Sequence, residues 1–337
     1  MEGANIMDGH RVVAAAGLAI LAALGVVSCG GRNDAPTGTA GATPDSRRLV
    51  VGYSQIGAES AWRTANTISI KTEAAKRGID LRFADAQQKQ ENQLKALRSF
   101  LAQKVDVVML SPVVETGWEP VLRDLKAAGI PVILCDRRVT VTDDSLYVTF
   151  VGPDVVEEGR RAGKWLAAKM NGQARIAELQ GTPGSAPAID RKKGFEEVLA
   201  GFPGMKIIKS QTGDFTRSKG KEVMEAFLKS PEGKDINALY AHNDDMALGA
   251  IQAIEAAGLK PGTDIVIVSV DGVKGAFEAM VAGKLNCTVE CNPLLGPQIF
   301  DAVKAIAAGK SVSKHIKSDE GVFDQSQAVD VIGSRQY

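Results

Sequence analysis

The sequence predicts an α/β protein with two doubly wound, parallel-sheet domains. From residue 47 onward, short apolar runs alternate with longer amphipathic stretches, which is typical of repeated strand and helix units. Several apolar runs contain no alternating polar residues, as expected for strands that helices cover on both faces. These units are too many for one small sheet, and 337 residues with 45% hydrophobic content suffice for two cores.

The strands and helices can be assigned in chain order from this pattern. The predicted strands are the apolar runs at 49–54, 79–86, 105–112, 130–136, 174–181, 205–211, 236–243, 264–272 and 285–291. Leu94, Leu97 and Leu101 share one helical face, because they are three or four residues apart. The clearest predicted helices cover residues 61–77, 91–103, 218–230 and 244–258.

The N-terminal residues predict export and a lipid anchor. Arg11 precedes an uncharged apolar run at 12–28, which is shorter than the roughly 20 residues of a membrane span. The end of this run, Val-Val-Ser before Cys29, resembles a bacterial lipobox. We therefore expect a signal peptide at 1–28, lipidation of Cys29, and an exported lipoprotein in the periplasm or on the outer face of the cytoplasmic membrane.

Two points about this terminus stay open. A short uncleaved membrane anchor would also export the remainder of the chain, and either Met1 or Met7 could be the true start. Residues 29–46 are rich in Gly, Thr, Ala and Pro, which predicts a flexible tether.

Charge and cysteine content narrow the function classes. Lys+Arg and Asp+Glu both number 40, so the net charge gives no reason to expect nucleic acid as a partner. Cys287 and Cys291 lie in one predicted strand, where a separation of roughly 13 Å is too large for a disulfide. Together with Cys135 they are expected to be buried free thiols. No cysteine or histidine spacing suits zinc, so we expect no metal and no cofactor.

Polar side chains follow many of the predicted strands in both halves. Such residues are Gln55, Asp85, Ser111, Asp136, Arg137, Asn243, Asp271 and Glu290. In open α/β sheets, ligands bind in the crevice beyond the carboxyl ends of the strands. Any single Asp or Asn there could instead be a helix N-cap, and one of Asn243 and Asp244 is expected to be one. The whole set predicts a polar small molecule held between two domains.

The residue types favour a sugar over a phosphate or an acyl substrate. Planar Asp, Asn, Glu and Arg groups can each address two neighbouring hydroxyls. Trp62 and Phe215 follow strands and could cover the apolar face of a sugar ring, although core packing explains either equally well. No GxxxxGK[ST] loop and no GxSxG motif occurs in the sequence.

From about Arg47 to the end, the chain resembles the type I periplasmic sugar-binding proteins of ABC importers, the ribose- and galactose-binding class. Within that class it resembles the galactofuranose-binding members. The stretches that carry the resemblance are AESAWRTAN, DAQQKQENQLKALRSFLAQ, SPVVETGWEPVL, AIDRKKGF, SQTGDFTRSKGKEVMEAF and AHNDDMALGAIQAI.

The resemblance implies sugar-contacting residues from both domains. Trp62 and Arg63 match the loop that closes over the sugar, and Asp136 and Arg137 match a pair that brackets ring hydroxyls. Arg191 matches an arginine that reaches in from the second domain. The full set is Trp62, Arg63, Gln87, Ser111, Asp136, Arg137, Arg191, Phe215, Asn243, Asp271 and Glu290. Ser111 stands where the ribose binder has Asn. Glu290 stands where it has Gln, which implies an altered hydroxyl pattern rather than loss of the site.

The resemblance also implies the domain limits and the mechanism. Three crossovers near 151, 290 and 318 would form a hinge between an N-terminal lobe, 47–151 plus 291–318, and a C-terminal lobe, 152–290 plus 319–337. The sugar would bridge both lobes and favour closure, and a membrane permease would recognise the closed form. The protein is expected to be a monomer that makes and breaks no bonds.

Other functions remain as alternatives. The ligand could be ribose, arabinose, galactopyranose or inositol. A secreted sugar-processing enzyme could use Asp136 with Asp271 or Glu290 as a carboxylate pair, although neighbouring arginines favour ion-paired acceptors. A LacI-type regulator would need an N-terminal helix-turn-helix, where this chain has an export signal. A role in chemotaxis could coexist with transport.

Overall fold

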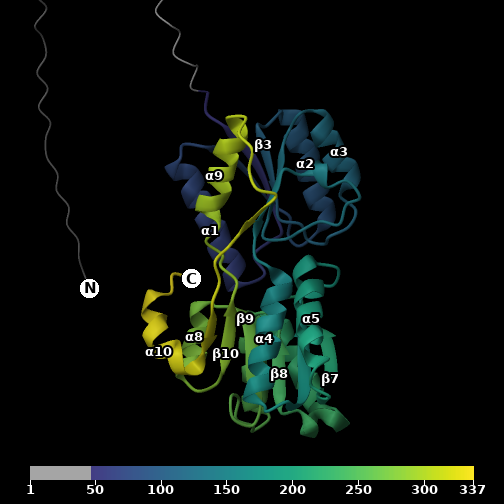
Figure 1. The fold of residues 1–337 in the computed structure, drawn as a ribbon, viewed down its shortest axis with the longest axis vertical. Helices are drawn as coiled ribbons and strands as arrows, with labels where there is room; N and C mark the ends of the chain where they lie inside the picture. The colour runs from purple at the N-terminus through teal and green to yellow at the C-terminus, as the bar shows by residue number, and fades with distance from the viewer. Residues whose placement is uncertain (1–46) are drawn as a thin grey trace, which may run out of the picture. The chain divides into compact units, whose positions relative to one another are not determined.

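The computed structural model describes residues 47–337, and Figure 1 shows their fold. The predicted signal peptide, the lipidation site Cys29 and the tether lie outside the described residues. Among the described helices, none combines the length and the apolar character that crossing a membrane requires.

The first of two sheets is fully parallel. Its strand order is β11-β5-β4-β3-β1-β2. The bounds are β1 Val50–Gln55, β2 Asp80–Asp85, β3 Val107–Leu110, β4 Val132–Cys135, β5 Thr149–Gly152 and β11 His315–Lys317. Its helices are α1 Ala61–Lys76, α2 Gln90–Gln103, α3 Glu119–Ala127 and α9 Gly296–Ala307. We call this sheet and its helices the first lobe.

Helices cover both faces of this sheet, which explains its continuous apolar strands. Figure 1 shows α1 and α9 on one side of the strands and α2 and α3 on the other. One buried cluster joins the sheet to Ile70 of α1 and Phe300 of α9. A second cluster joins the opposite face to Phe100 of α2 and Leu122 of α3. Such two-sided burial is the arrangement predicted from the sequence.

The second sheet has the order β12-β10-β9-β8-β6-β7, and β12 is its one antiparallel strand. The bounds are β6 Gln173–Gln180, β7 Gly204–Thr212, β8 Ala238–Ala241, β9 Val266–Asp271, β10 Cys287–Glu290 and β12 Val322–Asp324. Its helices are α4 Val155–Lys169, α5 Ala186–Leu199, α6 Arg217–Lys229, α7 Asp244–Ala256, α8 Lys274–Val281 and α10 Ala328–Val331. This sheet and its helices form the second lobe.

The chain passes between the two lobes three times. The passages lie between β5 and α4, between β10 and α9, and between β11 and β12, at 153–154, 291–295 and 318–321. The predicted fold class, two doubly wound sheets joined by a three-segment hinge, is therefore confirmed. In both lobes the parallel strands end on the side where the chain turns into the next helix, and the cavity described below lies there.

Candidate functional site

A small cavity lies at the carboxyl ends of strands from both sheets. Its lining residues are Glu59, Ser60, Trp62, Arg63, Asp136, Arg137, Pro187, Arg191, Phe215, Asn243, Asp271 and Cys291. The space between them is about 290 Å³, part of which is open to solvent. Its charged and polar lining suits a small polar molecule.

Direct contacts between the lobes enclose this cavity. The Ala61 amide donates to an Asp245 carboxylate oxygen at 2.7 Å, and the Trp62 indole N–H donates to the Cys291 carbonyl at 2.6 Å. The Glu115 amide donates to the Gly184 carbonyl at 2.9 Å. These bonds join the start of α1 and a loop of the first lobe to the second lobe and the hinge. The structure therefore holds the closed arrangement of the two lobes.

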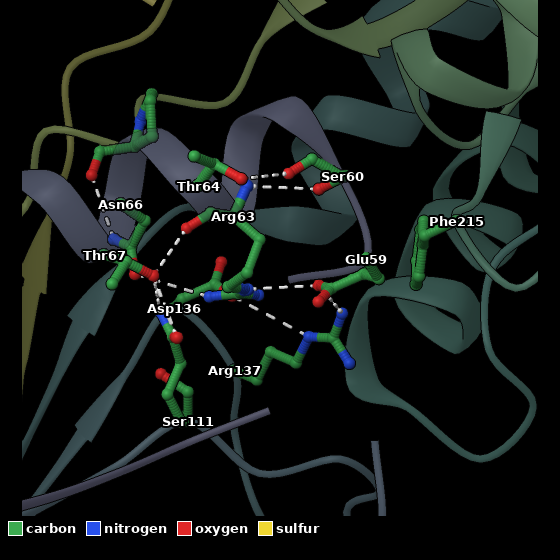
Figure 2. Close-up of polar contacts among 12 residues, drawn as sticks. Glu59, Ser60, Arg63, Thr64, Asn66, Thr67, Ser111, Asp136, Arg137 and Phe215 are labelled. Atoms are coloured by element: carbon green, nitrogen blue, oxygen red, sulfur yellow. Dashed lines mark hydrogen bonds and ion pairs between the residues drawn. The ribbon is translucent and has the colours of Figure 1, made fainter. Parts of the chain in front are cut away.

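The first lobe contributes an arginine held between two acids, as Figure 2 shows. Ser60 caps α1 by accepting a hydrogen bond from the Arg63 amide at 3.1 Å, which places Arg63 in the first helical turn. The Arg63 guanidinium contacts Asp136 Oδ2 at 2.5 Å and Glu59 Oε1 at 3.1 Å. Arg137 lies 3.7 Å from each of the same two carboxylates. Asp136 has a φ of 66°, which turns the chain sharply after β4.

The arginines of this cluster are charged at neutral pH, and two buried polar atoms of the cluster have no hydrogen-bond partner. Burial opposes the charge on Arg63, but Asp136 and Glu59 outweigh it and raise its pKa. Burial and the nearby Arg63 charge lower the pKa of Arg137 to about 10, so it remains cationic at neutral pH. Arg137 Nε and Glu59 Oε2 are buried without a hydrogen-bond partner. A ligand hydroxyl could accept from the first and donate to the second.

The second lobe contributes Arg191 from α5. Its Nε donates to Glu158 at 2.8 Å, its Nη1 donates to the His242 carbonyl at 2.5 Å, and its Nη2 lies 3.5 Å from Asp271. Burial opposes its charge, yet Glu158 and Asp271 raise its pKa well above the usual value. Burial also raises the pKa of the Asp271 carboxyl, and Arg191 limits that rise. Arg191 is thus charged, and its guanidinium is held in a fixed orientation by protein groups alone.

Phe215 and Asn243 complete the wall of the second lobe. Asn243 is the N-cap of α7, because its side-chain oxygen accepts from the Met246 amide at 3.0 Å. Its amide group donates to the Phe215 carbonyl at 3.1 Å and so fixes the turn that carries the ring. The Arg137 guanidinium lies 5.2 Å from the centre of that ring. The prediction that a cap stands at the start of this helix is confirmed.

A family model described as a periplasmic binding protein domain matches residues 51–311 of this chain. The chain belongs to the periplasmic binding protein family. The match confirms the resemblance that the sequence stretches indicate.

Several members of this family are similar over most of their length. The galactofuranose-binding protein YtfQ of Escherichia coli is 56% identical over 76% of this chain and 81% of its own. The binding component of the arabinose ABC transporter of Shewanella sp. ANA-3, solved with α- and β-L-arabinofuranose, is 55% identical with a TM-score of 0.83. That comparison covers 86% of this chain and 96% of the other. A Mycobacterium smegmatis protein in complex with β-D-fucofuranose is 54% identical with a TM-score of 0.83, over 86% and 95%.

The structure brings most of the predicted residues of this periplasmic binding protein to the cavity. Those that line it are Trp62, Arg63, Asp136, Arg137, Arg191, Phe215, Asn243 and Asp271. Pro187, whose loop the sequence left uncertain, lies in the first turn of α5, where its missing N–H is not needed.

Three predicted residues do not line the cavity. Gln87 is exposed after β2. The Ser111 hydroxyl is buried between strands, where it donates to the Cys135 carbonyl at 2.9 Å and contacts the Tyr53 hydroxyl at 3.0 Å. Glu290 Oε1 accepts from Arg335 at 2.5 Å, and Glu290 Oε2 accepts from the Gly321 amide at 3.0 Å. Each of these residues follows or ends a strand as the pattern requires, but their polar groups face other partners or solvent.

The sequence interpretation missed Glu59, Ser60 and Cys291 as lining residues. Glu59 and Ser60 lie just before the Trp62–Arg63 pair in AESAWR. Their place beside two predicted site residues was the sequence signal that could have found them. Beside the cavity, Glu158, Cys291 and Glu320 gather acidic and thiol groups within 4.8 Å of one another. Arg191 donates to Glu158 there.

Proposed function

We propose that this protein is the substrate-binding component of a sugar ABC importer and that it captures a monosaccharide in the furanose form, galactofuranose or a close relative. The observation that carries the proposal is the cavity itself, in which three buried arginines and their carboxylate partners converge from both lobes. Relatives that are more than half identical bind galactofuranose, arabinofuranose or fucofuranose. The eight predicted residues that line the cavity, together with Glu59, are the proposed contacts.

The proposed mechanism is capture by closure. The sugar would enter the open cleft, and its hydroxyls would bond to Arg137 and Glu59 on one side and to Arg191 and Asp271 on the other. The contacts between Ala61 and Asp245 and between Trp62 and Cys291 would then hold the lobes closed. Exclusion of water strengthens charged hydrogen bonds inside the cavity. A permease would recognise the closed form, and the sugar would be released chemically unchanged.

A ligand series tests the sugar class and its ring form. We expect 1,4-anhydrogalactitol, locked as a five-membered ring, to raise the melting temperature, and 1,5-anhydrogalactitol, locked as a six-membered ring, to leave it unchanged. A ligand at 100 times its dissociation constant stabilises the fold by about 2.7 kcal/mol. Galactose, arabinose, ribose, glucose and inositol complete the series. If no sugar shifts the melting temperature, the proposed ligand class is wrong, and if only the six-membered ring does, the ring form is wrong.

We further propose that the protein is exported as a monomer and anchored through a lipid on Cys29. The support is the lipobox-like sequence and the membership in a periplasmic binding protein family. Replacing Cys29 with alanine is expected to move the protein from the membrane fraction to the soluble fraction of the cell envelope. Ser28→Ala, which keeps the cysteine, is the matched control. Retention of Cys29→Ala in the membrane fraction would instead indicate the uncleaved anchor.

A further inference from the structure

Two carboxyls and a thiol lie close together where the three passages between the lobes meet. Two of them lie in the passages and one lies just after a passage. Glu158 follows the first passage on α4, Cys291 lies in the second, and Glu320 lies in the third. A carboxylate oxygen of each acid and the Cys291 sulfur all lie within 4.8 Å of one another. Glu158 and Cys291 are buried and Glu320 is partly buried. Two acids from different segments of the chain therefore lie close together at the junction of the two lobes.

If Glu158 and Glu320 were both ionised, the positive charge beside them would not neutralise both carboxylates. Arg191 donates to one oxygen of Glu158, and the other oxygen of Glu158 is buried without a partner. The Glu320 carboxylate accepts from the Ser318 hydroxyl at 2.7 Å and from the Asn292 amide at 3.4 Å, both of which are neutral donors. Arg161 bonds the Glu320 backbone carbonyl and not its carboxylate.

The other charged and titratable groups that face Glu158 and Glu320 add no further positive charge. Asp136 from the first lobe and Asp271 from β9 add negative charge, and the Tyr240 hydroxyl on β8 is neutral. Arg191 acts on both acids, and its guanidinium also lies 3.5 Å from Asp271. Burial and then the Glu158 charge raise the pKa of Glu320 to about 9, and burial raises the pKa of Glu158. The closed arrangement therefore favours a proton on Glu320 at neutral pH.

We propose that the Glu158–Glu320 pair couples closure of the lobes to pH: the protonated pair holds the three passages together, and ionisation of the pair favours opening. The proposal rests on the proposed function for its effect on sugar capture, but the hinge itself can be tested without a sugar.

The direction of the effect follows from proton linkage. Glu320 has a higher pKa in the closed arrangement than an exposed glutamate, about 4.3, so closure takes up a proton. The advantage of the closed arrangement is complete at low pH and is lost as pH rises toward the closed-state value. For one coupled proton, the affinity for a neutral ligand falls about tenfold for each pH unit between the two pKa values.

The experiment has one arm with ligand and one without. Titration calorimetry with galactose at pH 5.5, 7.0 and 8.5 is expected to show affinity that falls by about tenfold per pH unit, about a thousandfold over the whole series. Repeating it at pH 7.0 in two buffers of different ionisation enthalpy should reveal proton uptake. Small-angle scattering of the unliganded protein should show a larger radius of gyration at pH 8.5 than at 5.5.

The variants separate the pair from general effects of pH. Glu320→Gln keeps a neutral side chain of the same shape, so its affinity and its radius should no longer change between pH 5.5 and 8.5. Asp319→Asn removes an exposed acid from the same passage and should behave like the wild type. Wild-type binding and radius that do not change with pH, or a pH dependence that Glu320→Gln retains, would overturn the proposal. Absence of galactose binding at every pH would count against the proposed function, and the scattering arm would still decide the hinge.

Discussion

Arg191→Ala is expected to weaken sugar binding between about thirtyfold and several thousandfold. Truncating one partner of a buried, hydrogen-bonded charge pair costs about 2–5 kcal/mol, and each 1.4 kcal/mol is about tenfold in affinity. Arg191 has more than one such partner, because it bonds Glu158 and lies near Asp271. Titration calorimetry with galactose, for wild type and variant, measures the loss. Lys193→Ala, an exposed site on the same helix, is the matched control and should bind as the wild type does.

A damaged fold could imitate this loss, so a second variant separates the two effects. Without Arg191, Glu158 and Asp271 are buried acids with no cation. Because burial raises their pKa values, Arg191→Ala should melt at a higher temperature at pH 5 than at pH 8. Adding Glu158→Gln removes one uncompensated charge and should recover part of the melting temperature without recovering binding. If the double variant binds galactose normally, Arg191 is not a ligand contact.

Gly194→Ala is expected to lower the free energy of unfolding by about 3 kcal/mol, at the upper end of the cost of overpacking. A Cβ at Gly194 would lie 1.9 Å from the Val156 carbonyl oxygen, and a Cβ at Gly159 would lie 2.2 Å from the Arg191 carbonyl oxygen. The two glycines thus let α4 and α5 pack backbone against backbone. Because backbone atoms cannot move aside as a side chain can, the helices must separate, and Arg191 moves with α5.

Urea unfolding of Gly194→Ala and of Gly201→Ala tests this packing. Gly201 follows the same helix, and its nearest heavy atom to an added Cβ is the Val198 carbonyl oxygen at an ordinary 3.5 Å. Helix propensity alone would make Gly194→Ala stabilising by about 1 kcal/mol, so the expected sign is opposite to the local effect. Equal unfolding midpoints for wild type and Gly194→Ala would show that the helices do not touch as described.

The sequence predicted most long elements but missed three of the short strands. α7 extends over Asp244–Ala256 inside the predicted 244–258, because its apolar spacing is a local property. β5, β11 and β12 are not among the predicted strands. β11 and β12 have three residues each, too few for a period to show. Their pairing partners are distant in the chain, as in the register of His315 with Phe150.

Local patterns along the chain were enough to predict the fold class and the chemical character of the site. Apolar periodicity and the polar residues that follow strands can be recognised within short stretches of sequence. They predicted Asp136, Asn243 and Asp271 as site residues, and all three line the cavity. Which of these groups converge on the cavity follows from contacts between distant parts of the chain. Ser111 and Glu290 satisfy the same local pattern but bond to residues far along the chain. The Ser111 hydroxyl donates to the Cys135 carbonyl, and the Glu290 carboxylate accepts from Arg335. A hydrogen bond depends on the position of both partners, and a strand pattern describes only one of them.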